Sequence, residues 1–263
     1  MKTETTSPRM QSMMRRWTLV MAVVAMLSGF AAAPATAQDA ASIMDDVRSS
    51  YVEMFDGVDN YIVESDLYTT YYKRENGGGP LAFKTSTQLK GQSSPMGGQT
   101  VQNQFEQFDK LAEHGTYSGT ETIDGVECYV ITVGDPSKID PNLSSMNEMK
   151  YFIGVDDNHI HRMEMSGNGA QQGMSGMTIH LGDYRTTDGV TLPWKMTFET
   201  QMSEAQRQQM QQMKKRMEQM PEAQRERMES MMGKQMEAIM SGDPVVVTVQ
   251  SVTVNADLPE GAF

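Results

Sequence analysis

The feature that most constrains the fold is an alternation of apolar and mostly polar residues through residues 190–199. The apolar positions are Val190, Leu192, Trp194, Met196 and Phe198. Successive side chains of a β-strand point to opposite faces, so this segment predicts a strand with one apolar and one solvated face. The apolar face must be covered, either by helices of the same chain or by a ligand.

Turn signals place this strand in an antiparallel sheet. Asp188-Gly189 precedes it and Asp124-Gly125 precedes another apolar segment, and aspartate-glycine between such segments is a strong hairpin signal. A mainly β (α+β) fold follows, as a sandwich, a barrel or a strongly curved antiparallel sheet. We predict strands at residues 61–72, 81–89, 126–133, 151–155, 159–165, 177–185, 190–200 and 245–256.

Helices are expected at two places before the second half of the chain. Residues 40–55 have apolar side chains every three or four positions and end at Gly57, which predicts an amphipathic N-terminal helix. Residues 101–114 are closer to a helical than to a strand pattern.

Residues 1–37 have the layout of a cleavable signal peptide. A basic stretch containing Arg15 and Arg16 precedes an uncharged run, Trp17 to Phe30, and small residues end in an A-x-A site at Ala37. A membrane span needs about 20 apolar residues, so the shorter run favours cleavage over anchoring. We therefore expect export to the periplasm, with cleavage near Ala37.

The expected mature chain, residues 38–263, is strongly acidic. The leader holds four of the 22 basic and one of the 34 acidic residues, so its removal changes the net charge from −12 to −15. That charge argues against nucleic acid as a partner. No later run is apolar enough to span a membrane, so we do not expect an integral membrane protein. Cys128 is the only cysteine, which excludes an internal disulfide.

A methionine-rich segment at residues 202–242 interrupts the strands and predicts an inserted helical pair within the single domain 38–263. Residues 201–243 contain ten methionines but no leucine, valine or phenylalanine. We expect a second helix to begin at Pro221, or a single helix to be kinked there. Methionine adapts to irregular apolar partners, so these faces either pack on the sheet or form an adaptable lid over a ligand. The methionines on the two faces are Met210, Met213, Met217, Met228, Met232 and Met236.

An alternating histidine and methionine row predicts an alternative function. His159, His161, Met163 and Met165 would share one face of a strand, opposite Ile160 and two charged residues. Imidazole and thioether ligands suit Cu(I), so an envelope copper-binding protein is the alternative. Residues two apart on a strand are nevertheless about 6.6–7 Å apart, which is far from an automatic chelate.

Known catalytic motifs are missing from the sequence. It holds no nucleophile elbow, H-E-x-x-H helix or phosphate-binding loop. We expect a protein without enzymatic activity or cofactor. A hydrolase with sequence-distant catalytic residues is the third hypothesis.

The chain resembles, over roughly residues 40–263, the LolA/LolB-like superfamily of periplasmic lipoprotein-sorting and lipid-binding proteins. The resemblance rests on the order of the predicted elements and on four segments. These are residues 123–131, residues 151–155, D-Y-x-x-x-D-G-x-x-x-P within residues 182–193, and N-x-x-L-P-x-x-x-F within residues 252–263. It implies an incomplete β-barrel whose concave face, covered by helices, binds acyl chains. The methionine-rich insertion departs from that pattern and leaves the ligand open.

The leading hypothesis is a periplasmic carrier or sensor for lipid, lipoprotein acyl chains or a similar apolar ligand. Inner- or outer-membrane sorting components would be its protein partners. The expected ligand contacts are Leu192, Trp194, Met196 and Phe198 on the sheet, with the six methionines named above as a lid.

Overall fold

The ten β-strands of the described chain form one antiparallel sheet. The computed structural model describes residues 39–90, 106–167, 174–202 and 243–263, with isolated positions at 208, 212 and 215. The strands are β1 (Asn60–Ser65), β2 (Tyr68–Arg74), β3 (Phe83–Leu89), β4 (Thr116–Ile123), β5 (Val126–Val133), β6 (Met146–Gly154), β7 (Ile160–Gly167), β8 (Met174–Thr187), β9 (Val190–Met202) and β10 (Val245–Val254).

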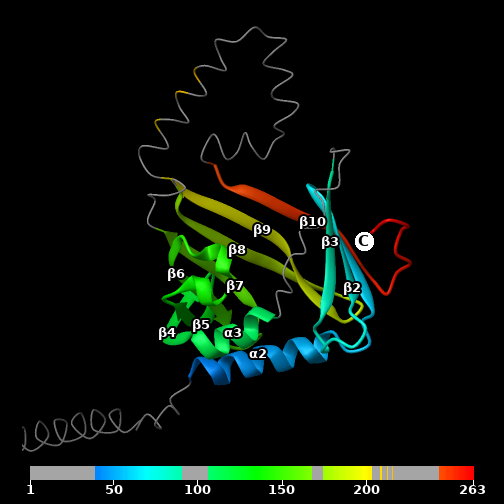
Figure 1. Cartoon of the computed structure of the whole chain (residues 1–263), viewed down its shortest axis with the longest axis horizontal. Coiled ribbons are helices and arrows are strands. Elements are labelled where there is room, and N and C mark those ends of the chain that lie inside the picture. The colour runs from blue at the N-terminus through cyan, green and yellow to red at the C-terminus, as the bar shows by residue number, and fades with distance from the viewer. Residues whose placement is uncertain are drawn as a thin grey trace, which may run out of the picture. The chain divides into compact units, whose positions relative to one another are not determined.

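The strand order is β3-β2-β1-β10-β9-β8-β7-β6-β5-β4. From β4 to β10 each strand pairs with its sequence neighbour (Figure 1). The hairpin strands β1, β2 and β3 join this row through the pairing of β1 with β10. In that junction Tyr61 lies opposite Val254 and Val63 opposite Val252. The sheet therefore pairs the first strand of the described chain with the last one.

Two Asp-Gly pairs make tight hairpin turns as predicted. Asp124 and Gly125 have φ values of 50° and 89°, and Asp188 and Gly189 have 49° and 86°. Positive φ at both central residues is the conformation of a type I′ turn, whose twist matches that of paired strands. These turns fix the registers of β4 with β5 and of β8 with β9.

Two α-helices pack together beside the sheet. Helix α2 (Ala40–Met54) begins at Asp39, whose carboxylate accepts a hydrogen bond from the Ser42 amide at 2.8 Å. Helix α3 (Glu106–His114) contacts it through an ion pair of 3.3 Å between Arg48 and Asp109. Figure 1 shows α2 running along the lower end of the sheet. Two short 3-10 turns, Pro136–Lys138 and Pro141–Leu143, connect β5 to β6.

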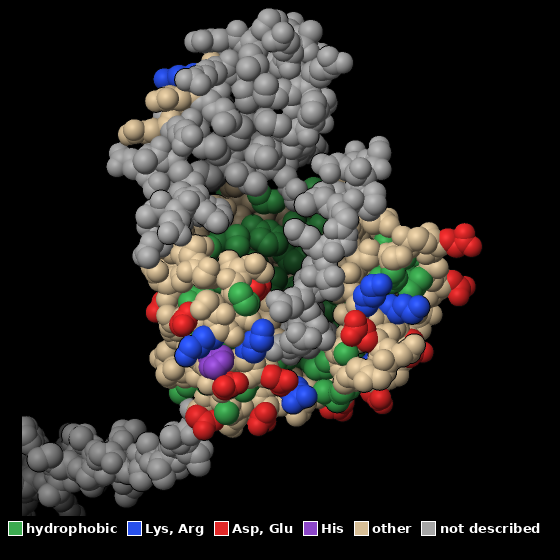
Figure 2. Space-filling model, in the orientation of Figure 1, with side chains coloured by type: hydrophobic (Ala, Val, Ile, Leu, Met, Phe, Trp, Pro, Cys, Tyr) green, Lys and Arg blue, Asp and Glu red, His purple; other side chains and the backbone are tan. Residues whose placement is uncertain are grey.

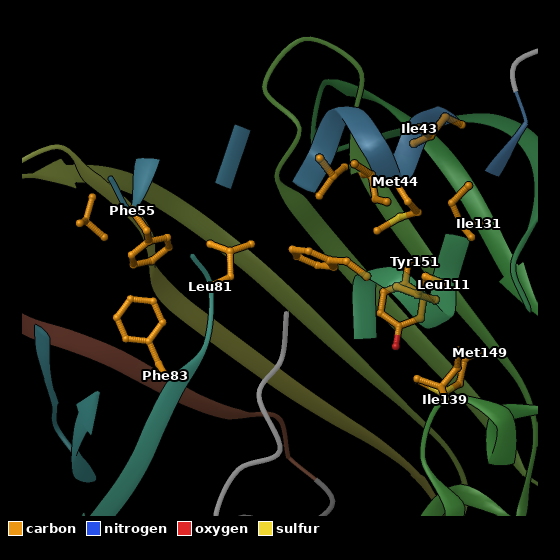
Figure 3. Packing of buried hydrophobic residues seen from close by; sticks show 14 of the residues in the cluster. Ile43, Met44, Phe55, Leu81, Phe83, Leu111, Ile131, Ile139, Met149 and Tyr151 are labelled. Carbon is orange, nitrogen blue, oxygen red and sulfur yellow. The ribbon is translucent and has the colours of Figure 1, made fainter. Parts of the chain in front are cut away.

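The main hydrophobic core joins the helices to the sheet (Figure 3). Its α-helical side chains include Ile43 and Leu111, which are 1% and 0% exposed, and its sheet side chains include Ile131 and Tyr151. Each fully buried aliphatic or aromatic side chain contributes about 1.5–3 kcal/mol. This burial fixes where the helices sit over the strands.

The structure confirms a mainly β fold with a curved antiparallel sheet and an N-terminal helix. It divides the single strand predicted at residues 61–72 into β1 and β2, because the Ser65 hydroxyl accepts a hydrogen bond from the Tyr68 amide at 2.9 Å and closes a turn. Strand β4 was not predicted. The predicted signal peptide 1–37 and most of the methionine-rich insertion 202–242 lie outside the described residues. None of the helices within the described ranges is long and apolar enough to cross a membrane.

Candidate functional site

A cavity of about 360 Å³ lies against the sheet, and both helices contribute to its wall. Figure 2 shows hydrophobic side chains gathered in a hollow of the molecular surface. The volume falls within the roughly 300–1,000 Å³ that is usual for small-molecule sites. The described lining residues are Tyr51, Phe55, Tyr61, Val63, Tyr68, Tyr72, Gln107, Phe108, Leu111, Tyr151, Ile160, Met163, Ile179, Leu181, Tyr184, Leu192, Pro193, Met196, Phe198 and Val249.

The described lining of this cavity carries no charged side chain. Gln107 supplies an amide and six tyrosines supply hydroxyl groups, while the remaining residues are apolar. An ionised ligand group inside such a wall would lose its hydration without gaining a counter-ion, which is costly. The cavity is therefore suited to an uncharged, largely apolar molecule.

The cavity tyrosines are neutral hydrogen-bonding groups at physiological pH. Burial raises the pKa of Tyr151 to about 12, and burial together with the nearby Asp157 charge raises the pKa of Tyr51 to about 12. Burial also raises the pKa of Tyr184, whose hydroxyl donates to the Ile160 carbonyl oxygen at 2.5 Å. These phenols can orient a polar atom of a ligand without contributing charge.

Three of the four sheet residues predicted as ligand contacts line the cavity, namely Leu192, Met196 and Phe198. Trp194 does not line it; its ring lies beneath the Arg185 guanidinium, 4.5 Å from carbon Cζ to the ring centroid. Pro193, assigned to the solvated face by alternation, lines the cavity instead. The positive φ of 54° at Asp183, on the adjacent strand, marks a local distortion of the paired strands at this point.

Sequence reasoning missed the wall contributed by the N-terminal part of the chain. Tyr61, Tyr68 and Tyr72 belong to β1 and β2, which reach the cavity only because β1 pairs with β10. The aromatic richness of residues 61–72 was the available signal. The six predicted lid methionines, Met210, Met213, Met217, Met228, Met232 and Met236, lie outside the described residues.

Over most of its length, the chain is structurally similar to LolA-superfamily, lipoprotein-sorting and DUF1329 proteins. A DUF1329 family protein from Desulfovibrio piger matches with a TM-score of 0.45 and 10% identity, over 85% of this chain and 96% of that one. An outer membrane lipoprotein-sorting protein domain from Vibrio parahaemolyticus matches with a TM-score of 0.44 and 9% identity, over 84% of this chain and 94% of that one. A LolA superfamily protein from Nitrosomonas europaea matches with a TM-score of 0.40 and 11% identity, over 85% of this chain and 96% of that one.

No protein-family profile and no curated protein sequence matches the chain.

The histidine and methionine row does not keep its alternation in the structure. The pairing of β6 with β7 shifts register between Phe152 and Ile153, so Ile160 lines the cavity together with Met163. Met165 packs against the main core. Among the described residues no group of three or more His, Cys, Asp or Glu side chains is placed to hold a metal ion. Copper binding stays an untested prediction.

The two histidines of the row instead surround the turn between β6 and β7. A ring nitrogen of His161, Nε2, lies 2.9 Å from the Asp157 carboxylate, which also accepts from the His159 amide at 2.9 Å. The His159 ring stacks on Tyr184 with centroids 4.6 Å apart. Burial lowers the pKa of His159, against the opposing charge of Asp157. This arrangement explains the histidines as turn-stabilising groups.

Cys128 is buried on the other side of this part of the sheet, where it belongs to a small cluster with Phe152. Burial is the main cause that raises the pKa of its thiol to about 11. A thiol with that pKa is almost entirely protonated at neutral pH, and the thiolate is the reactive form. The geometry therefore gives Cys128 a packing role.

Protonation of His159 is expected to destabilise the fold as the pH falls. Because its folded pKa is lowered, the unfolded chain binds the proton more readily, so stability decreases below the unfolded pKa of about 6.5. We expect a lower melting temperature at about pH 5 than at about pH 7, with a smaller decrease in His159→Phe, which keeps the ring stacked on Tyr184. Thermal denaturation across this range measures the difference. An equal decrease in both proteins would contradict the assignment to His159.

Proposed function

We propose that the protein is a periplasmic carrier or sensor that binds a lipid, a lipoprotein acyl chain or a similar apolar ligand without transforming it. The observation that carries this proposal is the cavity against the sheet, whose described lining is uncharged and largely apolar. Burying apolar ligand surface there yields about 25 cal/mol per Å² removed from water. Membrane-associated sorting components would be the partners that load or receive the ligand.

The methionine-rich segment is part of the proposal as an adaptable cover for the bound ligand. Its sequence places methionines at helical spacing in the insertion between β9 and β10. Both of these strands contribute side chains to the cavity wall. An unbranched thioether side chain would adjust to apolar ligands of different shape.

Met196→Glu tests the cavity as the binding site. Met196 lines it, so the new carboxylate would have to be buried in an uncharged wall or protonated. We expect the affinity for the neutral dye N-phenylnaphthylamine to fall at least about tenfold, which corresponds to about 1.4 kcal/mol. Dye fluorescence titration measures this affinity, with circular dichroism to establish that the variant is folded.

Val246→Glu is the matched control, because it makes the same change of charge at an exposed side chain of the adjacent strand β10. Its dye affinity should equal that of the unmodified protein. Equal affinities for all three proteins would show that the dye does not bind in this cavity.

Native mass spectrometry of residues 38–263, purified from a periplasm, tests whether a natural ligand is bound. We expect a non-covalent mass of lipid size, and less of it in a variant that lacks residues 203–241. A protein that carries no such mass and also takes up no added acyl ligand would refute the carrier function.

A further inference from the structure

The volume of the cavity can be compared with the volume of an alkyl chain. The cavity holds about 360 Å³, and its described lining carries no charged side chain. A methylene group fills a volume similar to that of a water molecule in the liquid, roughly 30 Å³. The cavity therefore has room for one uncharged chain of about twelve carbon atoms. A second chain of that length would need about twice this volume.

The two helices close one side of the cavity. Tyr51 of α2 and Phe108 of α3 both line it, and their rings meet edge to face with centroids 5.2 Å apart. Leu111 of α3 also lines it, belongs to the main core and is 0% exposed. A ligand chain could extend past these side chains only by separating the helices from the core. This wall is therefore a boundary of the cavity.

Tyr68 and Met196 meet at another part of the cavity wall. Tyr68 lies on β2 and Met196 on β9, and two strands, β1 and β10, separate them in the sheet. Both side chains line the cavity, and the Tyr68 hydroxyl lies 4.0 Å from the Met196 sulfur. Non-bonded atoms in contact are about 3.5–4.0 Å apart, so no alkyl chain fits between these two side chains.

The backbone of Tyr68 is held by the turn that precedes β2. The Ser65 hydroxyl accepts a hydrogen bond from the Tyr68 amide at 2.9 Å and donates one to the Tyr68 carbonyl oxygen at 3.0 Å. Ser65 is itself 0% exposed. The Tyr68 ring therefore projects toward Met196 from a fixed backbone position.

We propose that the cavity encloses one uncharged alkyl or acyl chain of about twelve carbon atoms, and that Tyr68 and Met196 set this length. This inference rests on the proposed function and specifies the ligand of the same cavity. Such a chain occurs in single-chain molecules and also as one of several chains of a larger lipid. In the second case the remaining chains stay outside the cavity.

Methyl esters of increasing length, from methyl octanoate to methyl hexadecanoate, measure the length that the cavity accepts. Each ester is titrated as a competitor of N-phenylnaphthylamine bound to the unmodified protein. Each enclosed methylene group should lower the Kd about fourfold, whereas a protruding one stays in water and changes the Kd little. We expect the Kd to fall up to methyl dodecanoate and to level off beyond it. A Kd that falls equally steeply up to methyl hexadecanoate would overturn the proposal.

Tyr68→Ala tests whether this side chain limits the length, because it removes a phenol ring from the cavity wall. The Kd should then level off at an ester that is longer by at least about two carbon atoms. Met196→Ala opens the same contact from β9 and should have the same effect. Tyr71→Ala is the matched control, since it removes the same ring from β2 at a position that does not line the cavity. If both cavity variants fold and level off where the control does, Tyr68 and Met196 do not set the length.

Monododecanoylglycerol and didodecanoylglycerol, used as competitors in the same way, distinguish the two sources of the chain. Equal competition would support one enclosed chain of a larger lipid, with the second chain outside. Much weaker competition by didodecanoylglycerol would support a single-chain molecule as the ligand. Much stronger competition by it would show that both chains are enclosed, which overturns the proposal. Failure of the dye and of every ester to bind the unmodified protein would instead refute the proposed function.

Discussion

Gly115→Ala is expected to lower the free energy of unfolding by about 3 kcal/mol. Gly115 directly follows α3, and a Cβ atom there would lie 2.4 Å from the Leu111 carbonyl oxygen and 2.7 Å from a methyl carbon of Ile131. The oxygen belongs to the backbone of α3, so relief requires a shift of the helix end. Since α3 also carries Phe108 and Leu111 of the cavity wall, ligand affinity should decrease with stability.

Thermal or urea denaturation measures this effect, and a melting temperature lower by about 6–12 °C is expected for a domain of this size. Gly134→Ala is the control, because no atom lies within 4 Å of its added Cβ. Only a small change in melting temperature is expected for Gly134→Ala. Equal effects of the two substitutions would show that the close approach of Gly115 to α3 does not exist in solution.

Arg74→Met is expected to destabilise the protein by about 3 kcal/mol through the loss of charged hydrogen bonds. The Arg74 guanidinium donates to the Val58 carbonyl oxygen at 2.8 Å and to that of Phe55 at 2.6 Å, and it also bonds the Pro80 carbonyl. It thereby ties β2 to the end of α2 and to the turn before β3. Its carbon Cζ lies 4.9 Å from the centroid of the Phe83 ring.

Arg74→Lys should recover only part of this stability, because an ammonium group cannot reproduce the planar fork that reaches several carbonyls. Lys73→Met is the control, since it removes a positive charge from an exposed neighbouring position of the same strand. Chemical denaturation measures the free energy of unfolding of the three variants and so ranks their stability. Similar losses for Arg74→Met and Lys73→Met would indicate a general charge effect in place of the specific bonds.

Local patterns predicted the parts of the fold that local physics determines. The alternation from Val190 to Phe198 corresponds to β9, and both Asp-Gly pairs make hairpin turns. The predicted helix at residues 40–55 corresponds to α2, whose Asp39 cap and buried face are encoded within a few neighbouring residues. Turn chemistry and side-chain period act over short distances, which is why one sequence suffices to detect them.

The rest of the site depends on pairings that no local pattern contains. Tyr61 reaches the cavity because β1 pairs with β10. The shift in the β6–β7 register lets Ile160 line the cavity as Met163 does, and a single alternation rule cannot anticipate such a shift. Likewise, Pro193 replaces Trp194 in the cavity wall where Asp183 adopts a positive φ. Strand order and irregularities in pairing thus decide which aromatic rings line the cavity.

The pairing of β1 with β10 determines when the domain can complete its folding. The Asp59 amide donates to the Asn255 side-chain oxygen at 2.7 Å across a separation of 196 positions. Closing so long a loop is entropically costly and slow, and it cannot begin before the last strand has been synthesised. Until then β1 lacks its partner strand β10, and the part of the cavity wall that contains Tyr61 is not in place. In the exported carrier proposed above, this delay would keep the polypeptide unfolded, and so able to pass through a translocation channel, until its C-terminus has left the ribosome.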